Sequence, residues 1–321
     1  MTGPPAATAA VRVAVRRCLH DLPDDAAVAA AVSGGADSLA LAAALGFMRP
    51  GSVALVVDHG MQPGSAQVAG RAAEQCRGLG LDAEVLRGAG PSATTPGGPE
   101  AAARALRYRL IDGAVAARGL AAVLLGHTLD DQAETVLLGL GRGSGARALA
   151  GMAPTRGAYR RPLLGLDRAT VRAACVEAGL APHDDPHNAD AAFARARVRS
   201  DVLPLLEQAL GPGVAAALAR TADQLRQDAD ALDALTPSLP AEPVCAELAP
   251  LPAALRSRAL KGWAEQRCGG AVTSTHVEAL RALVEQWRGQ GAVALPGGVR
   301  VLRVDGRLVD DLPGPERARE G

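Results

Sequence analysis

Two short segments of this chain combine residue types that could bind phosphate and hold a cation. The first is SGGADS, residues 33–38, which follows an apolar run and opens an alanine- and leucine-rich stretch. Glycines allow the backbone to approach a bound group closely, and the first N–H groups of a helix donate to anions. The segment therefore predicts a phosphate-binding turn between a buried strand and a helix.

This turn differs from the common phosphate loop GxxxxGK[ST], because no lysine follows its glycines and Lys261 is the only lysine of the chain. Ser33 and Ser38 add hydroxyl donors to the turn. Asp37 places a carboxylate beside the expected phosphates, where it suits a bridging magnesium ion. The residues therefore favour a phosphate site in which a divalent metal completes the binding.

The segment GHTLDDQAET, residues 126–135, is the second signal. In a helix over residues 130–140, Glu134 shares a face with both Asp130 and Asp131, so three carboxylates crowd one end. An acidic helix start capped by Asp130 is one interpretation. The other is a site for magnesium or for a cationic co-substrate, which the position after a strand favours.

His127 and Arg104 are two further candidates. His127 directly precedes the acidic cluster, and it could be a base, a nucleotide contact or a hydrogen-bonded structural histidine. In EAAARALRY, Arg104 shares a helical face with Glu100 and Tyr108. A clamp on phosphates and a solvated salt-bridge ladder both fit that pattern.

The elements that must position these groups alternate along the chain. Strand-like runs cover residues 27–32, 53–57, 83–86 and 121–125, and helical patterns cover residues 65–79 and 99–117. Continuous apolar strands joined by helices indicate a parallel sheet covered on both faces, an α/β fold. Ligands of such a sheet lie beyond the carboxyl ends of its strands. Polar residues follow three of the expected strands at that edge: Ser33, Asp58 with His59, and Gly126 with His127.

We expect two domains, residues 1–212 and residues 213–321, with the boundary at a Gly-Pro-Gly turn. A helix over residues 193–209 ends the first domain, and a helix over residues 214–235 begins the second. The second domain is expected to be small and mostly helical, with helices carrying Trp263 and Trp287 as core residues. Its last segment, VRVLRVDGRLV, predicts a hairpin with Asp-Gly at the turn.

Positive charge is concentrated locally, although 34 basic and 34 acidic residues give a formal net charge of zero. Seven arginines and a single acidic residue lie between residues 142 and 172, and Arg195, Arg197 and Arg199 follow within five residues. Solvated helix faces have this composition. Two arginine clusters beside a nucleotide site also suit a polyanionic substrate.

The five cysteines are scattered without a C-x-x-C pair, which excludes the usual zinc spacings and an obvious redox dithiol. Free thiols in a reducing compartment are expected. The first residues lack the apolar core of a signal peptide, and no stretch approaches a charge-free membrane span of about 20 residues. These features predict a cytoplasmic protein.

SGGADS after a strand resembles the pyrophosphate loop of the N-type ATP pyrophosphatases, which split ATP into AMP and pyrophosphate. With its other motifs in order, the chain resembles the tRNA(Ile)-lysidine synthase family over most of its length. The motifs are SGGADS, VDHG, EAAAR with RY, HTLDDQAET, RGSGARALAGM, RPLL, DPHN and F-x-R-x-R-x-R. The resemblance implies an adenine nucleotide α-hydrolase-like fold with ATP and Mg2+ as cofactors. It also implies that ATP adenylates the C2 oxygen of the wobble cytidine in an isoleucine tRNA with a CAU anticodon. The amine of free L-lysine then displaces AMP.

The resemblance assigns roles to particular residues. The nucleotide is expected at Ser33, Gly34, Gly35, Ala36, Asp37, Ser38, Asp58 and His59, and the metal at Asp37 and Asp130. The catalytic positions are Asp131, Glu134, His127 and Arg104. With tRNA as the substrate, the two arginine clusters described above predict tRNA contacts at Arg142, Arg195, Arg197 and Arg199. The chain departs from the family pattern at Met61 with Gln62, at His187 and at Ala196.

Two other classes compete with this interpretation. GMP, NAD and asparagine synthetases and tRNA thiolases share the ATP loop, but no ammonia-producing unit is visible and no cysteine follows an expected strand. A non-catalytic nucleotide sensor would not need the acidic cluster or the arginine-rich segments. The sequence leaves the oligomeric state open, a homodimer included.

Overall fold

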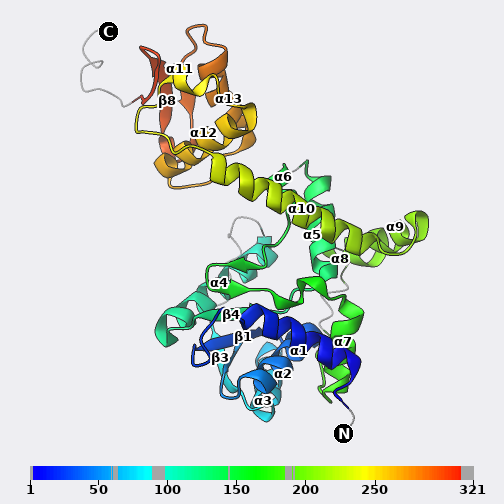
Figure 1. Cartoon of the computed structure of the whole chain (residues 1–321). Helices are drawn as coiled ribbons and strands as arrows, with labels where there is room; N and C mark the ends of the chain where they lie inside the picture. The colour runs from blue at the N-terminus through cyan, green and yellow to red at the C-terminus, as the bar shows by residue number, and fades with distance from the viewer. Residues whose placement is uncertain are drawn as a thin grey trace. The chain divides into compact units, whose positions relative to one another are not determined.

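The structure is a computed structural model of the 321-residue chain. It describes residues 3–58, 60, 64–88, 98–143, 145–184, 190 and 192–311. The chain divides into two compact units, Met1–Arg226 and Gln227–Gly321. The division falls within helix α10 (Val214–Leu235), whereas the boundary expected from the sequence, 212/213, lies just before this helix (Figure 1).

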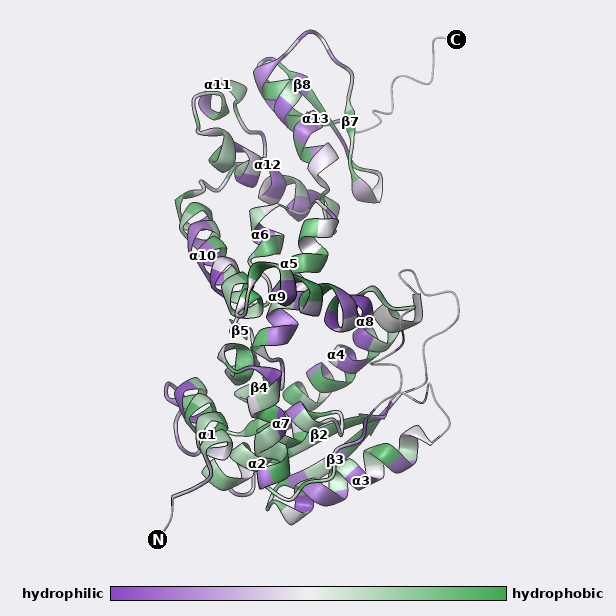
Figure 2. Ribbon diagram, turned by 90° about the vertical axis from the view of Figure 1, so that its right-hand side faces the viewer, coloured by the Kyte–Doolittle hydropathy of each residue, from purple (hydrophilic) through white to green (hydrophobic). Residues whose placement is uncertain are grey.

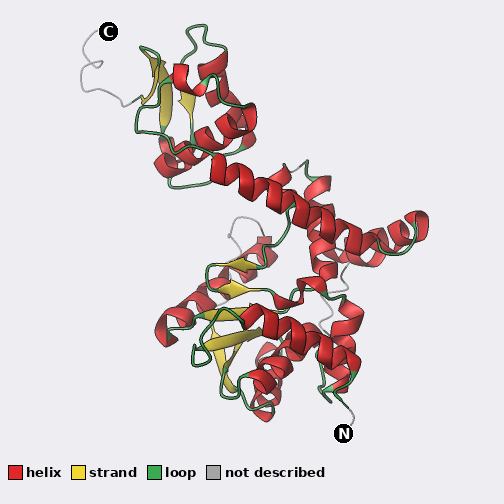
Figure 3. Ribbon diagram, in the orientation of Figure 1, coloured by secondary structure: helices red, strands yellow, loops and turns green. Residues whose placement is uncertain are grey.

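The first unit contains a six-stranded sheet with the order β3-β2-β1-β4-β6-β5 (Figures 1 and 3). Its strands are β1 (Val28–Val32), β2 (Val53–Asp58), β3 (Asp82–Arg87), β4 (Ala122–Leu125), β5 (Thr155–Arg156) and β6 (Tyr159–Arg160). All neighbouring strands pair in parallel except β5, which is antiparallel to β6. The expected parallel α/β sheet is confirmed.

The helices of this unit are α1 (Ala6–Leu19), α2 (Ala36–Met48), α3 (Ser65–Gly78), α4 (Gly98–Arg118), α5 (Leu129–Gly141), α6 (Ala146–Leu149), α7 (Arg168–Glu177), α8 (Ala194–Arg197) and α9 (Leu203–Leu210). Helices α2 and α3 cover one face of the sheet and α4 covers the other. Alternate residues of β1 separate the two layers, since Ala30 packs with α1, α2, α3 and α7 and Ala29 packs with α4. Figure 2 shows hydrophobic residues concentrated in the sheet and in α2.

The arginine-rich segment after residue 192 was expected to form one helix. The structure confirms one continuous helical segment, Ala194–Leu210, in which a π-helical turn at Val198–Val202 joins α8 to α9. A π turn inserts an extra residue into the helical ladder and so changes the direction in which the following side chains point. Pro204 lies at the start of α9, where a missing N–H is tolerated.

The second unit packs three helices against a three-stranded antiparallel sheet of order β7-β8-β9. Its elements are α11 (Cys245–Leu248), α12 (Ala253–Cys268), α13 (Ser274–Glu285), β7 (Val293–Ala294), β8 (Arg300–Val304) and β9 (Arg307–Asp310). The expected hairpin is confirmed, with Asp305 and Gly306 at positive φ in its turn. Trp263 is a core residue, 3% exposed, as expected. The expectation for Trp287 is wrong, because it follows the end of α13 and is 40% exposed.

All five cysteines are free thiols. Within the described residues, no single helix is both long and apolar enough to cross a membrane. The segments Ala194–Leu210 and Val214–Leu235 reach that length and composition only as a pair, bent by 98°.

Candidate active site

The glycine turn after β1 leads directly into α2, as the sequence predicts. Gly34 adopts a φ of +86°, a conformation that a side chain would disfavour. The Ser33 N–H donates to Ser38 Oγ over 3.1 Å, and the Ser38 hydroxyl donates to the Gly35 carbonyl over 2.9 Å. The described residues provide no side-chain cap for the N-terminus of α2. The N–H groups of this helix start therefore suit an anionic ligand.

The end of β4 lies against this turn. A Cβ atom added to Gly126 would lie 3.1 Å from the carbonyl carbon and oxygen of Asp37 and 3.2 Å from the Ser38 Cα. Only a glycine allows the two backbones to approach this closely. Gly126 therefore sets the distance between the glycine turn and the start of α5.

Gly126→Ala is expected to weaken nucleotide binding by about tenfold or more, because the added methyl group must push the backbone of the phosphate turn away. Titration of the purified protein with a non-hydrolysable ATP analogue measures this. Gly113→Ala is the matched control, since its Cβ in α4 would meet nothing within 4 Å. That substitution should leave affinity unchanged and stabilise the helix by about 0.5–1 kcal/mol. Equal affinities in the two variants would contradict the prediction.

The cap of α5 is Thr128, and not Asp130 as one interpretation of the sequence had it. Asp131 Oδ2 accepts the Thr128 N–H over 2.8 Å, while the Thr128 hydroxyl accepts the N–H of Asp131, so the two form a capping box. Asp130 Oδ2 accepts the backbone N–H of Arg168 over 2.7 Å, at the start of α7. The acidic segment therefore begins α5 and also anchors α7.

Three arginines surround Glu134, whose side chain is fully buried. Arg199 donates to both carboxylate oxygens, over 2.7 Å from Nε and 3.0 Å from Nη2. Arg168 Nη2 donates to Glu134 Oε1 over 3.0 Å, and Arg195 Nε lies 3.3 Å from Glu134 Oε2. Arg168 Nη2 also donates to Asp131 Oδ1 over 2.9 Å. The acidic cluster is therefore neutralised by the protein itself.

Sequence reasoning missed Arg168 altogether and placed Arg195 and Arg199 on a tRNA-contacting surface. In this structure, Arg195 and Arg199 point into the acidic cluster, and Arg195 Nη2 also donates to Thr135 Oγ1 over 2.7 Å. The available signal for Arg168 was its place at the start of a helix within an arginine-rich segment. That pattern is common on protein surfaces, so it did not single out this residue.

The environment of Asp37 disfavours the ionised form of its carboxylate. Burial and, to a smaller extent, the nearby Asp131 raise the pKa of Asp37 to about 6, although Arg168, Arg172 and Arg199 act in the opposite direction. Its Oδ1 atom is buried, and no residue of the described part of the chain hydrogen-bonds it. A cation bound beside this oxygen would favour the ionised carboxylate and would give the Oδ1 atom a partner.

The donor set around Asp37 fits magnesium held mainly by substrate oxygens. Magnesium usually keeps several waters and takes one or two carboxylates together with phosphates. The described residues contain no group of three or more His, Cys, Asp or Glu side chains that could hold a metal alone. Since Asp130 already accepts the backbone N–H of Arg168, Asp37 is the carboxylate better placed for this role.

His127 lies between β4 and α5 with a buried Nδ1 atom that no described residue hydrogen-bonds. Burial lowers the pKa of His127 to about 4. Asp131 raises this pKa, whereas Arg161, Arg104 and Arg195 lower it. The imidazole is therefore neutral at pH 7, and its Nδ1 atom is available as an acceptor or a donor, depending on the tautomer.

The low pKa of His127 predicts a loss of stability in mild acid. The unfolded chain protonates this histidine near pH 6.5 and the folded chain only near pH 4. The contribution of the neutral His127 to the free energy of unfolding is therefore fully present above pH 6.5 and is lost as the pH falls toward 4. The contribution reaches at most about 3 kcal/mol. Urea unfolding between pH 4.5 and 7 should give a flatter profile for His127→Gln than for the wild type. His20→Gln, at an exposed position, should follow the wild-type profile.

The remaining predicted residues have varied positions. Asp58 is 8% exposed at the end of β2, where Oδ1 accepts the Gly60 N–H over 3.1 Å. Arg104 is exposed on α4, its guanidinium 5.2 Å from the Tyr108 ring centre. Arg142 is exposed at the end of α5, and Arg197 Nη1 donates to the Ala192 carbonyl. His59, Met61, Gln62 and the DPHN segment with His187 lie outside the described residues.

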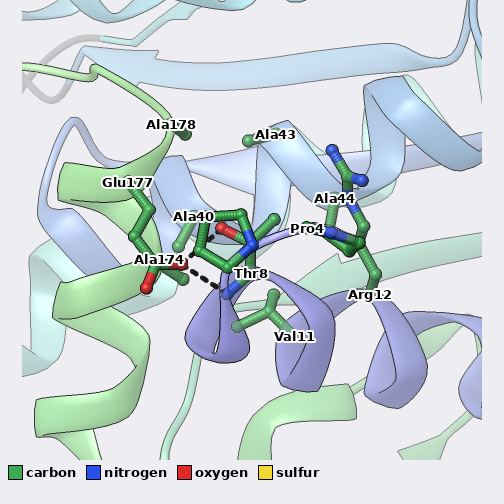
Figure 4. Close-up of a pocket in the computed structure, with 11 residues that line it drawn as sticks. Pro4, Thr8, Val11, Arg12, Ala40, Ala43, Ala44, Ala174, Glu177 and Ala178 are labelled. Carbon is green, nitrogen blue, oxygen red and sulfur yellow. Dashed lines mark hydrogen bonds between the residues drawn. The ribbon is translucent and has the colours of Figure 1, made fainter. Parts of the chain in front are cut away.

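A cavity of about 360 Å³ lies elsewhere, between α1, α2 and α7 (Figure 4). Alanines of α2 and α7 form much of its wall, and Glu177 Oε2 accepts both the N–H and the hydroxyl of Thr8 at its edge. The glycine turn and the acidic cluster do not line it. The cavity is therefore separate from the site at the strand ends.

A sheet of this order, with a glycine turn after its first strand, places the first unit among the PP-loop domains. Residues 8–206 match the family described as PP-loop domain, and residues 244–309 match the family described as TilS substrate binding domain. The U34-tRNA thiolase NcsA from Methanococcus maripaludis has a similar fold, with a TM-score of 0.59 and 21% identity over 68% of this chain and 79% of that one. At that identity the likeness concerns the fold alone.

Curated relatives are much closer in sequence. The tRNA(Ile)-lysidine synthase of Thermobifida fusca is 50% identical over 96% of this chain and 99% of its own length. That of Leifsonia xyli is 52% identical over 90% and 91%, and that of Streptomyces coelicolor is 47% identical over 96% and 99%. The chain belongs to the tRNA(Ile)-lysidine synthase family.

Proposed function

We propose that this protein is an ATP-dependent ligase that forms lysidine in an isoleucine tRNA with a CAU anticodon. It would adenylate the C2 oxygen of the wobble cytidine and then join free L-lysine to C2, releasing AMP and pyrophosphate. The observation that carries this proposal is about 50% identity to enzymes named tRNA(Ile)-lysidine synthase along nearly the whole chain. The geometry agrees, because the strand ends bring a phosphate turn and an acidic helix together.

The nucleotide phosphates would lie at residues 33–38, against the start of α2. Its N–H groups and the two serine hydroxyls would donate to the phosphate oxygens. Asp37, with its unpartnered Oδ1, would hold a magnesium ion together with those oxygens. When bound, the metal would neutralise negative charge on the phosphates. Asp58, at the end of the neighbouring strand, would contact the same nucleotide.

The attacking lysine must lose a proton before it can react. With a pKa near 10.4, only about one amine in 2,500 is neutral at pH 7, so deprotonation costs about 4.6 kcal/mol without help. Asp131 is the carboxylate better placed to hold the ammonium, since its side chain is 13% exposed and that of Glu134 is fully buried. The neutral His127 would then accept the proton, because negative phosphates nearby raise the pKa of an imidazole.

The contact with tRNA would involve other arginines. Arg195 and Arg199 are held by Glu134, so we assign them to the acidic cluster and keep Arg142 and Arg197 as candidate phosphate contacts. The second unit contains the segment that matches a substrate binding domain, and it would bind the tRNA as well. Because such contacts release counterions, binding should weaken steeply as the salt concentration rises.

The test is AMP release from ATP in the presence of free lysine and an isoleucine tRNA transcript with a CAU anticodon. Mass analysis of the anticodon nucleotides then shows whether lysine was added. AMP formation that requires the tRNA, with lysine on the wobble cytidine, would support the proposal. AMP release without any change in that cytidine would exclude it and point to another acceptor.

A thiolase-like activity is disfavoured by the cysteines. Burial raises the pKa of Cys76 to about 11, and burial also raises the pKa of Cys175. Such thiols are inert at neutral pH. Neither cysteine lies at a strand end, since Cys76 is in α3 and Cys175 is in α7.

A further inference from the structure

Arg168 is the one residue in the described part of the chain that pairs with carboxylates on both sides of the site. Its Nη2 atom lies 2.9 Å from Asp131 Oδ1 and 3.0 Å from Glu134 Oε1, on the acidic helix α5. Its Nε atom lies 4.0 Å from Asp37 Oδ2, in the nucleotide turn. A single guanidinium therefore connects the two halves of the site.

The backbone of Arg168 is firmly held. Its N–H donates to Asp130, and Asp167 caps the same helix by accepting the Thr170 N–H over 2.6 Å. Val171 and Cys175 of α7 are fully buried in the core beneath the sheet. Because the helix is fixed, the side chain of Arg168 can exchange partners only by rotating its own dihedral angles.

The other two arginines of the cluster form ion pairs with carboxylates of α5 only, within the described residues. Arg195 and Arg199 form their ion pairs with Glu134 and Asp131, and for the described residues the ion pair of Asp37 comes from Arg168. Glu134 would therefore still pair with Arg195 and Arg199 if Arg168 moved away. Asp131 keeps one weaker contact, since Arg199 Nη2 is 3.4 Å from its Oδ1 atom.

We propose that Arg168 is a positioning residue that couples nucleotide binding to lysine binding, an inference that rests on the proposed function. Without nucleotide, Arg168 occupies Asp131, the carboxylate assigned to the lysine ammonium. Nucleotide phosphates bound near Asp37 attract the guanidinium, and Asp131 Oδ1 becomes available to the ammonium. Nucleotide binding therefore strengthens lysine binding, and by thermodynamic reciprocity lysine strengthens nucleotide binding to the same extent.

The coupling is measured by calorimetric titration of lysine into the full-length protein with and without α,β-methylene-ATP and magnesium. The wild type is expected to bind lysine at least about tenfold more tightly when the analogue is present, a coupling of about 1.4 kcal/mol. In Arg168→Gln the ratio of the two affinities should fall to near one. Arg168→Lys keeps the positive charge but lacks the several coplanar N–H donors of a guanidinium, so an intermediate ratio of affinities is expected.

Arg16→Gln is the matched control, because Arg16 is an exposed arginine in the last turn of α1, and within the described residues no ion pair joins it to the carboxylates of the site. It should keep the wild-type ratio. A merely structural role of Arg168 would lower thermal stability but leave the ratio of affinities unchanged. Arg168→Lys, which keeps the buried charge, supplies the measurement if Arg168→Gln does not fold.

Two outcomes separate this inference from the proposed function. A protein that makes lysidine, and in which Arg168→Gln or Arg168→Lys retains the full ratio, would overturn the role of Arg168 alone. A wild-type protein that binds no lysine in either condition and leaves the wobble cytidine unchanged would overturn both.

Discussion

Asp131→Asn is expected to lower the rate of lysidine formation by at least about 100-fold without weakening ATP binding. The substitution removes the negative charge that would hold the lysine ammonium. It makes no direct change to the nucleotide turn, because Asp131 is on α5 and its hydrogen bonds go to Thr128, Arg168 and Arg199. Its indirect effect favours the nucleotide, since Arg168 no longer pairs with a charged Asp131. The rate loss should therefore appear in the step that uses lysine.

The low pKa of Asp131 supports this assignment. Burial raises that pKa, but Arg168, the Thr128 N–H and Arg195 lower it by more, so the carboxylate is ionised at neutral pH. An asparagine at this position would also turn an amide N–H group toward Arg168, which costs stability.

Single-turnover assays at saturating lysine, combined with analogue titrations, separate the two effects of Asp131→Asn. Asp25→Asn, in an exposed turn before β1, is the control and should behave as the wild type. If Asp131→Asn weakened ATP binding as much as it slowed turnover, the assignment of Asp131 to the lysine side would be wrong.

Glu134→Gln is expected to destabilise the protein by about 3 kcal/mol and to abolish measurable turnover. The glutamate is fully buried and balances three guanidinium groups, so its neutral analogue leaves partly buried positive charges without a counter-ion. Removing one partner of a buried ion pair costs more than the pair contributes, because the remaining charge stays desolvated.

Urea unfolding at pH 7 measures this loss for Glu134→Gln. Glu74→Gln, at an exposed position of α3, should change stability by less than about 0.5 kcal/mol. Adding Arg199→Gln to Glu134→Gln should restore part of the lost stability, since it removes one of the unpaired charges. Additive losses in the double variant would show that the two side chains do not interact.

Local sequence determined the framework of the site. Apolar runs of strand length, each followed by a glycine or a polar residue, predicted a parallel sheet with its site at the carboxyl edge. The structure confirms the parallel sheet, and in it Ser33 follows β1, Asp58 ends β2 and Gly126 follows β4. These features follow from hydrogen bonding and side-chain alternation within a few residues, so one chain segment is enough to specify them.

Only the tertiary structure decided which charges meet. Arg168 and Arg199 reach Glu134 from 34 and 65 residues further along the chain, and Arg199 lies within the π turn after α8. Nothing in the sequence pattern separates an arginine that faces a buried carboxylate from one that faces solvent or RNA. The distinction arises when α5, α7 and α8 pack together, because burial makes an unpaired charge costly and so selects the long-range partners.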